Sequence, residues 1–190
     1  MISFAERNFA RVAAEQAYRR VVEQARQPVF FTHYGVPDTL DGRFELICLH
    51  AFLYLHRLKA ERPQSRRVCQ RFFDRMFADF DRSLRELGVG DLSVGKHVKR
   101  MAQGFYGRIL AYEEGLAEDD ASLGAAIARN VFGTLAGSAS DAAALADYIR
   151  ASVRHLHRQA AADLLAGQIL FEMPARPRAG DDANLSRGAR

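Results

Sequence analysis

The chain contains no tryptophan, two cysteines and five prolines among its 190 residues. Cys48 and Cys69 do not form a Cys-x-x-Cys pair, which favours two buried thiols over a disulfide or a cysteine-based metal site. The Glu-x-x-His pair of di-iron helical bundles is also missing. The histidines are expected to be hydrogen-bonded or partly buried, so we predict no metal and no cofactor.

Long apolar runs are missing as well. Residues Leu46–Leu55 come nearest, but His50 interrupts them, and they make up about half of the roughly 20 residues that a bilayer-spanning helix needs. The N-terminal segment lacks the basic, apolar and small-residue order of a secretory signal, which makes the cytoplasm the expected location. The net charge of +4 permits an acidic partner or an anionic membrane surface without requiring either.

Catalytic signatures are equally scarce. The serines are expected on helix faces or near helix caps, and no nucleophile elbow surrounds any of them. Several acidic residues have basic partners four positions away, for example Arg75 with Asp79 and Arg82 with Glu86. This spacing is typical of a surface ion-pair ladder, and a charged docking face is the alternative. Neither the serines nor these paired charges indicate a hydrolytic site.

Hydrophobic residues recur at helical spacing along almost the whole chain. No strand-like alternation of useful length and no internal repeat is present. The expected helices cover Phe4–Arg26, Gly42–Ala60, Ser65–Leu87, Ser93–Leu116, Ala121–Phe132 and Asp141–Leu165. The last residues are rich in proline, glycine, arginine and alanine. We predict an all-α, single-domain bundle of about six helices over residues 1–171 and a disordered tail over residues 172–190.

The periodicity also predicts which residues are buried. The second expected helix is apolar nearly all round and should lie at the centre of the bundle. The first should bury Phe9 and Val12 together with its alanines. The third should begin with Ser65 as its N-cap and bury Leu84 and Leu87.

Residues 84–108 read LRELGVGDLSVGKHVKRMAQGFYGR and partly match a phosphate-binding loop. The segment from Gly90 to Lys96 fits the first seven positions of that loop. However, His97 stands where the loop needs a hydroxyl for magnesium, and a helix is expected where the loop needs a preceding strand. Nucleotide binding is therefore not expected.

A helix-turn-helix can also be aligned with residues 84–101. Gly88 would then lie in the turn and Val94 in the small core, with basic residues facing the DNA. Gly95 would weaken the recognition helix by about 1 kcal/mol, and the expected helix continues past Phe105 as a core helix does. DNA binding is the alternative function, whereas the main prediction involves no nucleic acid.

Two blocks of the sequence are long and unusual enough to compare with known families. The first comprises Gln24–Pro28, Tyr34–Asp38, Asp41–Phe44 and Leu49–His50; the second comprises Met76–Phe77, Asp79, Asp81, Leu84–Leu92, Val94–Lys96, Val98–Met101 and Phe105–Arg108. Over roughly residues 17–132, the chain resembles the ubiquinol–cytochrome c chaperone family. The second block resembles the family pattern along its full length, which favours this interpretation over both partial matches.

The resemblance implies a non-enzymatic assembly factor. Such a protein would bind newly made cytochrome b and support assembly of the cytochrome bc1 complex. In a bacterial setting, it would meet cytochrome b as a peripheral protein at the inner face of the cytoplasmic membrane. The ribosome and an anionic membrane surface are further partners that the resemblance suggests. A small-molecule carrier that uses the bundle interior is a third class of function.

Binding to an unfinished membrane subunit favours exposed aromatic and charged residues. The candidates are Phe30, Phe31, Tyr34, Asp38 and Arg43 near the first loop, Asp79, Asp81 and Glu86 on the third expected helix, and Lys96, Lys99, Arg100, Tyr106 and Arg108 on the fourth. The loop aromatics have an alternative role, which is to cap the bundle core. Asp38 and Asp41 have the alternative of forming turns and capping the second helix, with Arg43 bridging back to them.

Overall fold

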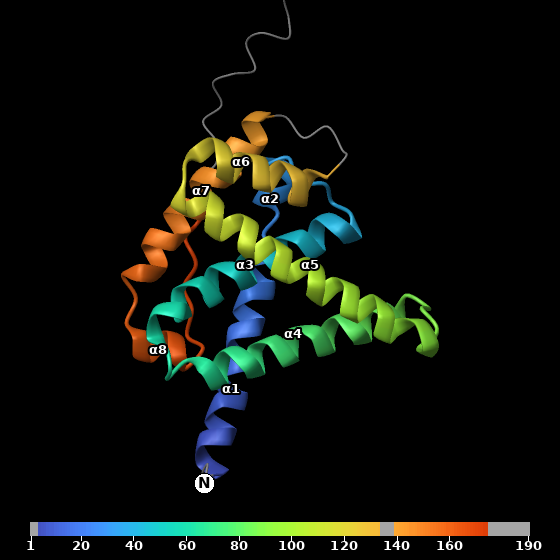
Figure 1. The fold of residues 1–190 in the computed structure, drawn as a ribbon, viewed down its shortest axis with the longest axis vertical. Helices are drawn as coiled ribbons and strands as arrows, with labels where there is room; N and C mark the ends of the chain where they lie inside the picture. Colours follow the sequence, from blue (N-terminus) through green and yellow to red (C-terminus); the bar gives the residue numbers. More distant parts are fainter. Residues whose placement is uncertain (1–3, 134–138, 175–190) are drawn as a thin grey trace, which may run out of the picture.

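The computed structural model describes residues 4–133 and 139–174, and within these residues it contains helices and no strand. The helices are α1 (Phe4–Ala25), α2 (Val29–Thr32), α3 (Leu40–Leu58), the 3-10 turn η1 (Lys59–Glu61), α4 (Arg66–Glu86), α5 (Asp91–Ala117), α6 (Asp120–Ile127), the π-helical turn η2 (Ala128–Phe132), α7 (Ala139–His157) and α8 (Ala161–Leu165) (Figure 1). The all-α prediction is confirmed. Each of the six predicted helices has a counterpart, and the last is divided into α7 and α8.

The predicted C-terminal tail begins at residue 172. Residues 172–174 belong to no helix, and the rest of the tail lies outside the described residues. The division into one helical domain and a disordered tail stays a prediction.

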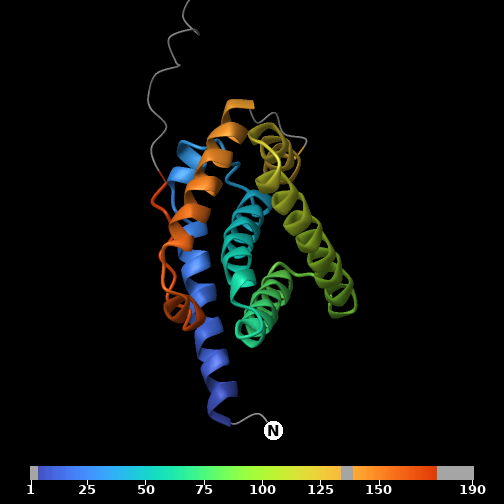
Figure 2. The same cartoon turned by 60° about the vertical axis from the view of Figure 1, so that its left-hand side comes forward.

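α3 is the central helix, as its apolar pattern predicted. It lies between α1 and α7 on one side and α5 on the other (Figures 1 and 2). Leu46, Leu49 and Leu53 are fully buried. Because every side of α3 meets another helix, few of its positions can carry a group for outside partners.

The start of α3 differs from the prediction. The side-chain oxygen of Thr39 accepts a hydrogen bond from the Gly42 N–H at 3.1 Å, so Thr39 is the N-cap. The prediction that Asp38 or Asp41 caps this helix is wrong, because Asp41 already lies in the first turn and Asp38 pairs with Arg43 at 2.7 Å. That Arg43 bridges back to Asp38 is confirmed.

α1 packs against α3 and α4 through small side chains. Its buried residues include the alanines at positions 10, 13, 14, 17 and 25. Phe9 and Val12 are instead 54% and 39% exposed, so the prediction that they are buried is wrong. The distance between packed helices depends on the side chains at the contact. Alanines allow close packing here, and the larger residues lie beside the contact.

Two predictions at the ends of α4 are also wrong. The hydroxyl of Ser65 donates a hydrogen bond to the Leu58 carbonyl at 2.8 Å, so Ser65 satisfies the end of α3 and does not cap α4. Leu87 is 59% exposed, because α4 has left the body of the protein where it ends. Leu84, predicted to be buried, is half-buried.

α4 and α5 form a long hairpin whose turn lies away from the other helices (Figure 1). Gly88 has a φ of 84°, which favours glycine. Its N–H donates to the Arg85 carbonyl at 2.9 Å, and the N–H of Val89 donates to the Leu84 carbonyl at 3.0 Å. These two bonds form a Schellman motif, which ends α4 and reverses the chain.

A polar seam joins α1, α3 and α7 inside the core. His50 is fully buried; its Nδ1 donates to the Leu46 carbonyl at 2.7 Å, and its Nε2 accepts from the hydroxyl of Tyr148 at 2.9 Å. Gln24 donates to the Tyr148 oxygen at 3.0 Å and to the Glu172 carbonyl at 3.1 Å. Burial lowers the pKa of His50 to about 4, so the imidazole is neutral at physiological pH.

None of the described helices combines the length and the apolar character needed to cross a membrane.

Candidate functional site

The base of the α4–α5 hairpin is closed by aromatic residues. We define the hairpin base as Phe44, Phe73, Phe77, Phe80, Phe105 and Tyr106 together with the Glu45–Arg108 pair. Its ring centroids lie 5.1 Å apart between Phe44 and Phe80, and 5.5 Å apart between Phe73 and Tyr106. The second contact joins α4 and α5 far from the turn, so the two helices pack along much of their length. This arrangement is a core hairpin and not the short crossing of a DNA-reading motif.

Arg108 forms an ion pair within this base. Its Nε donates to Oε2 of Glu45 at 2.6 Å, and its Nη2 contacts Oε1. The side chains of Arg108 and Glu45 are 18% and 8% exposed. Burial raises the pKa of Glu45 above its ordinary value, although the hydrogen bonds from Arg108 act in the opposite direction. Arg108 therefore joins α5 to α3 through its ion pair with Glu45. Glu45 was not among the residues that the sequence indicated as a partner.

Asp79 is likewise occupied within the protein. It accepts hydrogen bonds from the Tyr18 hydroxyl at 2.9 Å and from Arg75 at 3.2 Å, and it also pairs with Arg82. Arg75 reaches Glu15 on α1 at 2.6 Å. This network joins α1 to α4, so Asp79 has little capacity left for a partner.

The remaining acidic candidates on α4 differ from one another. Asp81 pairs with Arg85 at 2.7 Å, as the four-residue spacing predicted. Glu86 is exposed and has no ion pair among the described residues, because Arg82, its predicted partner, contacts Asp79. Glu86 is thus the acidic candidate on α4 that is most available to a partner.

The loop candidates divide between core and surface. Phe30 and Tyr34 are 0% and 4% exposed, so they cap the core and do not form an exposed aromatic surface. Phe31 is half-buried, with the Arg43 guanidinium 6.0 Å from its ring centre. Arg43 and Asp38 remain largely exposed while paired with each other. Phe31 is the loop aromatic that a partner could reach.

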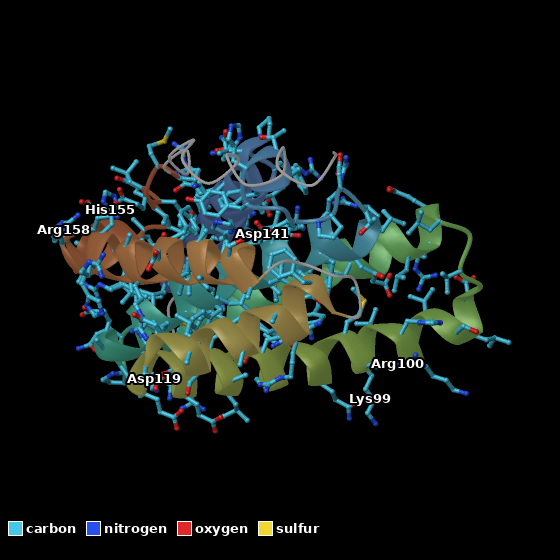
Figure 3. The ribbon with its side chains drawn as sticks, turned by 90° about the horizontal axis from the view of Figure 1, so that it is seen from above. Lys99, Arg100, Asp119, Asp141, His155 and Arg158 are labelled. Carbon is cyan, nitrogen blue, oxygen red and sulfur yellow. The ribbon has the colours of Figure 1, made fainter. Side chains whose placement is uncertain are left out.

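The most open candidate surface is the outer side of α5. We define the α5 outer face as Leu92, Lys96, Lys99, Gln103, Tyr106 and Leu110, which recur at helical spacing. Leu92, Tyr106 and Leu110 are 96%, 55% and 63% exposed. Lys96, Lys99 and the neighbouring Arg100 are exposed and form no ion pair among the described residues. Figure 3 shows Lys99 and Arg100 directed away from the ribbon of α5. This face combines unpaired cations with apolar side chains that are more than half exposed.

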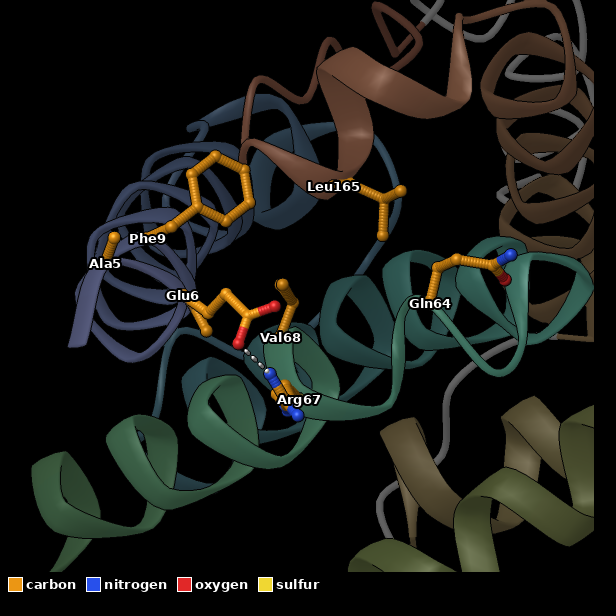
Figure 4. Close-up of a pocket in the computed structure, with 8 residues that line it drawn as sticks. Ala5, Glu6, Phe9, Gln64, Arg67, Val68 and Leu165 are labelled. Carbon is orange, nitrogen blue, oxygen red and sulfur yellow. Dashed lines mark hydrogen bonds and ion pairs between the residues drawn. The ribbon is translucent and has the colours of Figure 1, made fainter. Parts of the chain in front are cut away.

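A shallow depression of about 460 Å³ lies between α1, α4 and α8 (Figure 4). Phe9, Val68 and Leu165 give it a largely apolar lining. Glu6 and Arg67 form an ion pair of 3.2 Å at its edge. The depression was not predictable from the apolar spacing of α1, which assigns Phe9 to the core.

The described residues contain no group of three or more His, Cys, Asp or Glu side chains that could hold a metal ion. Cys48 is buried, as predicted, whereas Cys69 is half-buried; both are free thiols. Burial raises the pKa of both, which disfavours the reactive thiolate. The segment from Gly90 to Lys96 lies in the turn and first helical residues of α5, directly after a helix, and so lacks the strand of a phosphate-binding loop.

The described residues form an all-α protein with a projecting helical hairpin (Figure 1). The chain belongs to the ubiquinol-cytochrome C chaperone family, whose model matches residues 32–171. This match extends the resemblance inferred from the sequence through α7 and α8, and it leaves α1 outside.

Known relatives agree with this assignment. The chain is 30% identical over 155 residues to the mouse protein "Ubiquinol-cytochrome c reductase complex assembly factor 1", covering 82% of this chain and 52% of the relative. It is 28% identical over 162 residues to the Xenopus laevis protein of that name, covering 85% and 81%. With "Protein CBP3, mitochondrial" of Saccharomyces cerevisiae, it shares 31% identity over 107 residues, covering 55% and 32%. The chain thus spans about half the length of the mouse relative.

A solved structure supports the fold. The crystal structure of the Cbp3 homolog from Brucella abortus matches with a TM-score of 0.78 and 38% identity, covering 87% of this chain and 92% of that one. None of these relatives is named as a DNA-binding protein, and the comparisons give no support to the helix-turn-helix alternative.

Proposed function

We propose that this protein is a non-enzymatic assembly factor that binds newly made cytochrome b and supports assembly of the ubiquinol–cytochrome c reductase (bc1) complex. Family membership and the names of its relatives as reductase complex assembly factors support this role. The protein would act as a chaperone, holding an unassembled subunit without chemical change.

The observation that carries the proposal is the α5 outer face. Cytochrome b is a membrane subunit, and before assembly it exposes apolar segments that need a temporary partner. Tyr106 and Leu110 lie one helical turn apart and are both more than half exposed. Between them, Gly107 leaves room, since a Cβ there would meet nothing within 4 Å. An apolar segment can therefore lie flat across this part of α5.

Charges near this contact would orient the subunit. Glu86 suits the basic loops that membrane proteins keep on the cytoplasmic side, whereas Lys96, Lys99 and Arg100 suit acidic loops or anionic lipid headgroups. Phe31, Asp38 and Arg43, around the start of α3, are a second candidate contact. We place the protein in the cytoplasm, peripheral at the inner face of the membrane. The ribosome is a further proposed partner that rests on the family resemblance alone.

An affinity pull-down from solubilised membranes tests the proposal. The tagged chain should recover cytochrome b, and the L110E variant should recover several-fold less, because a carboxylate at the contact must be desolvated. Leu170→Glu is the matched control: at 66%, the exposed fraction of Leu170 is close to the 63% of Leu110, but Leu170 lies after α8, outside both candidate contacts. Deletion of the gene should also lower bc1 activity without changing transcript levels. Absence of cytochrome b from the wild-type pull-down contradicts the proposed function, and equal recovery by L110E and L170E contradicts the proposed surface.

A further inference from the structure

The turn of the α4–α5 hairpin carries apolar side chains in an unusual position. We define the hairpin tip as Leu87, Val89, Leu92, Lys96, Lys99 and Arg100. Leu87 directly follows α4, Leu92 is the second residue of α5, and their exposed fractions are 59% and 96%. The turn between these two helices lies away from the body of the protein (Figures 1 and 2). A leucine that is almost fully exposed buries no apolar surface when the chain folds, so it adds nothing to stability. The apolar surface of the tip is therefore available for contact with a molecule outside the chain.

The tip is also held in a defined shape. Residues 87–90 make the whole connection between the helices, and the Schellman bonds at Gly88 and Val89 fix its path. Arg85 pairs with Asp81 within α4 and with Asp91 across the turn. The Arg85–Asp91 pair joins the two helices and neutralises the carboxylate of Asp91 next to Leu92.

The charge of the tip is positive. Residues 84–100 contain four basic side chains and two carboxylates. Arg85 is occupied by its acidic partners, whereas Lys96, Lys99 and Arg100 have no ion pair among the described residues. Glu86 is the carboxylate that remains unpaired. The tip therefore presents an apolar end followed by unpaired cations on the same helix.

The spacing of these groups fits a lipid bilayer. With a helical rise of about 1.5 Å per residue, Lys96, Lys99 and Arg100 lie roughly 6, 10 and 12 Å from Leu92 along α5. The headgroup region on each side of a bilayer is roughly 5–8 Å thick. With Leu92 at the edge of the hydrocarbon, the long basic side chains reach the phosphates of the headgroups. The depressions lined by Phe9 and by His56 lie elsewhere, so neither provides a protein-binding groove at the tip.

We propose that the hairpin tip is a membrane-contacting element, in which Leu87 and Leu92 enter the boundary of an anionic bilayer and Lys96, Lys99 and Arg100 bind its phosphate headgroups. Charge complementarity selects anionic lipid as the occupant, since each basic residue near such a surface strengthens binding about fivefold. The tip would be the surface through which the proposed assembly factor reaches the membrane. Which membrane this is rests on the proposed function. The part of the α5 outer face around Leu110, nearer the body, remains open for cytochrome b.

The absence of tryptophan from the chain allows a direct test. The purified L92W variant would carry a single tryptophan at the tip, and L110W would carry one on the same helix away from it. With vesicles of phosphatidylcholine and phosphatidylglycerol, the emission of L92W should shift to the blue and be quenched by brominated lipid, whereas that of L110W should not. Vesicles of phosphatidylcholine alone should produce little change. Equal responses from both variants, or none from L92W, would overturn the proposal.

Vesicle flotation with charge variants tests the electrostatic part. Lys96→Gln with Lys99→Gln should weaken binding to anionic vesicles about 25-fold and flatten its salt dependence. Leu92→Glu should remove binding while L110E leaves it unchanged, and thermal unfolding should show that both variants remain folded. If L92E floats like the wild type, or if the tip substitutions instead remove an acidic protein from the pull-down without affecting vesicles, the tip is not a membrane contact.

The vesicles contain no cytochrome b, so the two proposals can fail separately. Loss of cytochrome b recovery in L110E with normal vesicle binding supports both surfaces. Vesicle binding without any recovery of cytochrome b contradicts only the proposed function.

Discussion

The base and the tip of the α4–α5 hairpin contain similar residues and use them in opposite ways. At the base, Arg108 is largely buried and forms an ion pair with Glu45, while Phe77 and Phe105 pack 6.2 Å apart. At the tip, Lys99 and Arg100 are exposed and unpaired among the described residues, and Leu92 is 96% exposed. The cation at the base is thus used for an ion pair within the protein, whereas the cations at the tip remain unpaired among the described residues. Residue type alone does not separate these roles; the distance from the body of the protein does.

The largest effect is expected where the base loses one member of its ion pair. Arg108→Ala leaves Glu45 buried without its partner and should lower the free energy of unfolding by about 3–5 kcal/mol. Replacing both residues, as Glu45→Leu with Arg108→Met, should recover most of this loss, because no unpaired charge remains. Urea denaturation measures both variants. If R108A is as stable as the wild type, the Arg108–Glu45 pair does not stabilise the base. The contrast between the paired cation of the base and the unpaired cations of the tip would then have no energetic meaning.

A second prediction extends the comparison to the seam of α1, α3 and α7. Burial lowers the pKa of His50 from 6.5 to about 4, so over this pH interval the unfolded chain binds a proton that the folded protein does not. The free energy of unfolding should therefore fall as the pH drops from 6.5 towards 4, with His50 contributing about 3 kcal/mol. The H50N variant should be less stable at neutral pH but lose this part of the pH dependence. Equal slopes for H50N and wild type would contradict the prediction.

Two glycines of α5 allow the packed part of this helix to be compared with its exposed part near the tip. A Cβ at Gly115 would lie 2.6 Å from Cα of Leu123 on α6, so Gly115→Ala should destabilise the protein by about 1–3 kcal/mol. A Cβ at Gly95, near the tip, would meet nothing within 4 Å. Gly95→Ala should therefore stabilise the protein by about 0.5–1 kcal/mol through helix propensity. Thermal unfolding of the two variants should give shifts of opposite sign, and shifts of the same sign would argue against an open face near the tip.

The smallest effects concern two tyrosine hydroxyls. Tyr18→Phe removes a hydrogen bond to the Asp79 carboxylate and should cost about 1–2 kcal/mol, since Asp79 keeps its contacts with two arginines. The hydroxyl of Tyr112 is buried with no hydrogen-bond partner among the described residues. Tyr112→Phe should leave stability unchanged or raise it by up to about 1 kcal/mol. Chemical denaturation of the pair under one condition distinguishes the two cases, and a large loss in Y112F would reveal a partner for that hydroxyl.

Much of the fold was predictable from the spacing of apolar residues. The all-α class, the central position of α3 and the approximate limits of the long helices follow from local periodicity, which the chain expresses almost without interruption. Errors arose where one helix meets another. Phe9 and Val12 were assigned to the core because they are apolar, yet α1 packs closely through its alanines and leaves the larger side chains outside.

The candidate surface was predictable only in part. The sequence identified Lys96, Lys99 and Arg100 as exposed, because the buried stripe of α5 defines the opposite side. It could not show that Arg108 lies next to Glu45, 63 positions away in the sequence, or that Tyr18 occupies Asp79. Both partners come from other helices, and the way those helices pack is not encoded in the periodicity of either one.

The C-terminal part of the described chain has a consequence for how the protein is made. Tyr54 on the central helix donates a hydrogen bond to the carbonyl of Leu164, and Gln24 on α1 donates one to the carbonyl of Glu172, 148 positions later. During synthesis, α1 and α3 emerge long before these acceptors exist. The core therefore lacks these hydrogen bonds until residue 172 has left the ribosome. A nascent chain halted earlier would expose part of its core to chaperones and proteases.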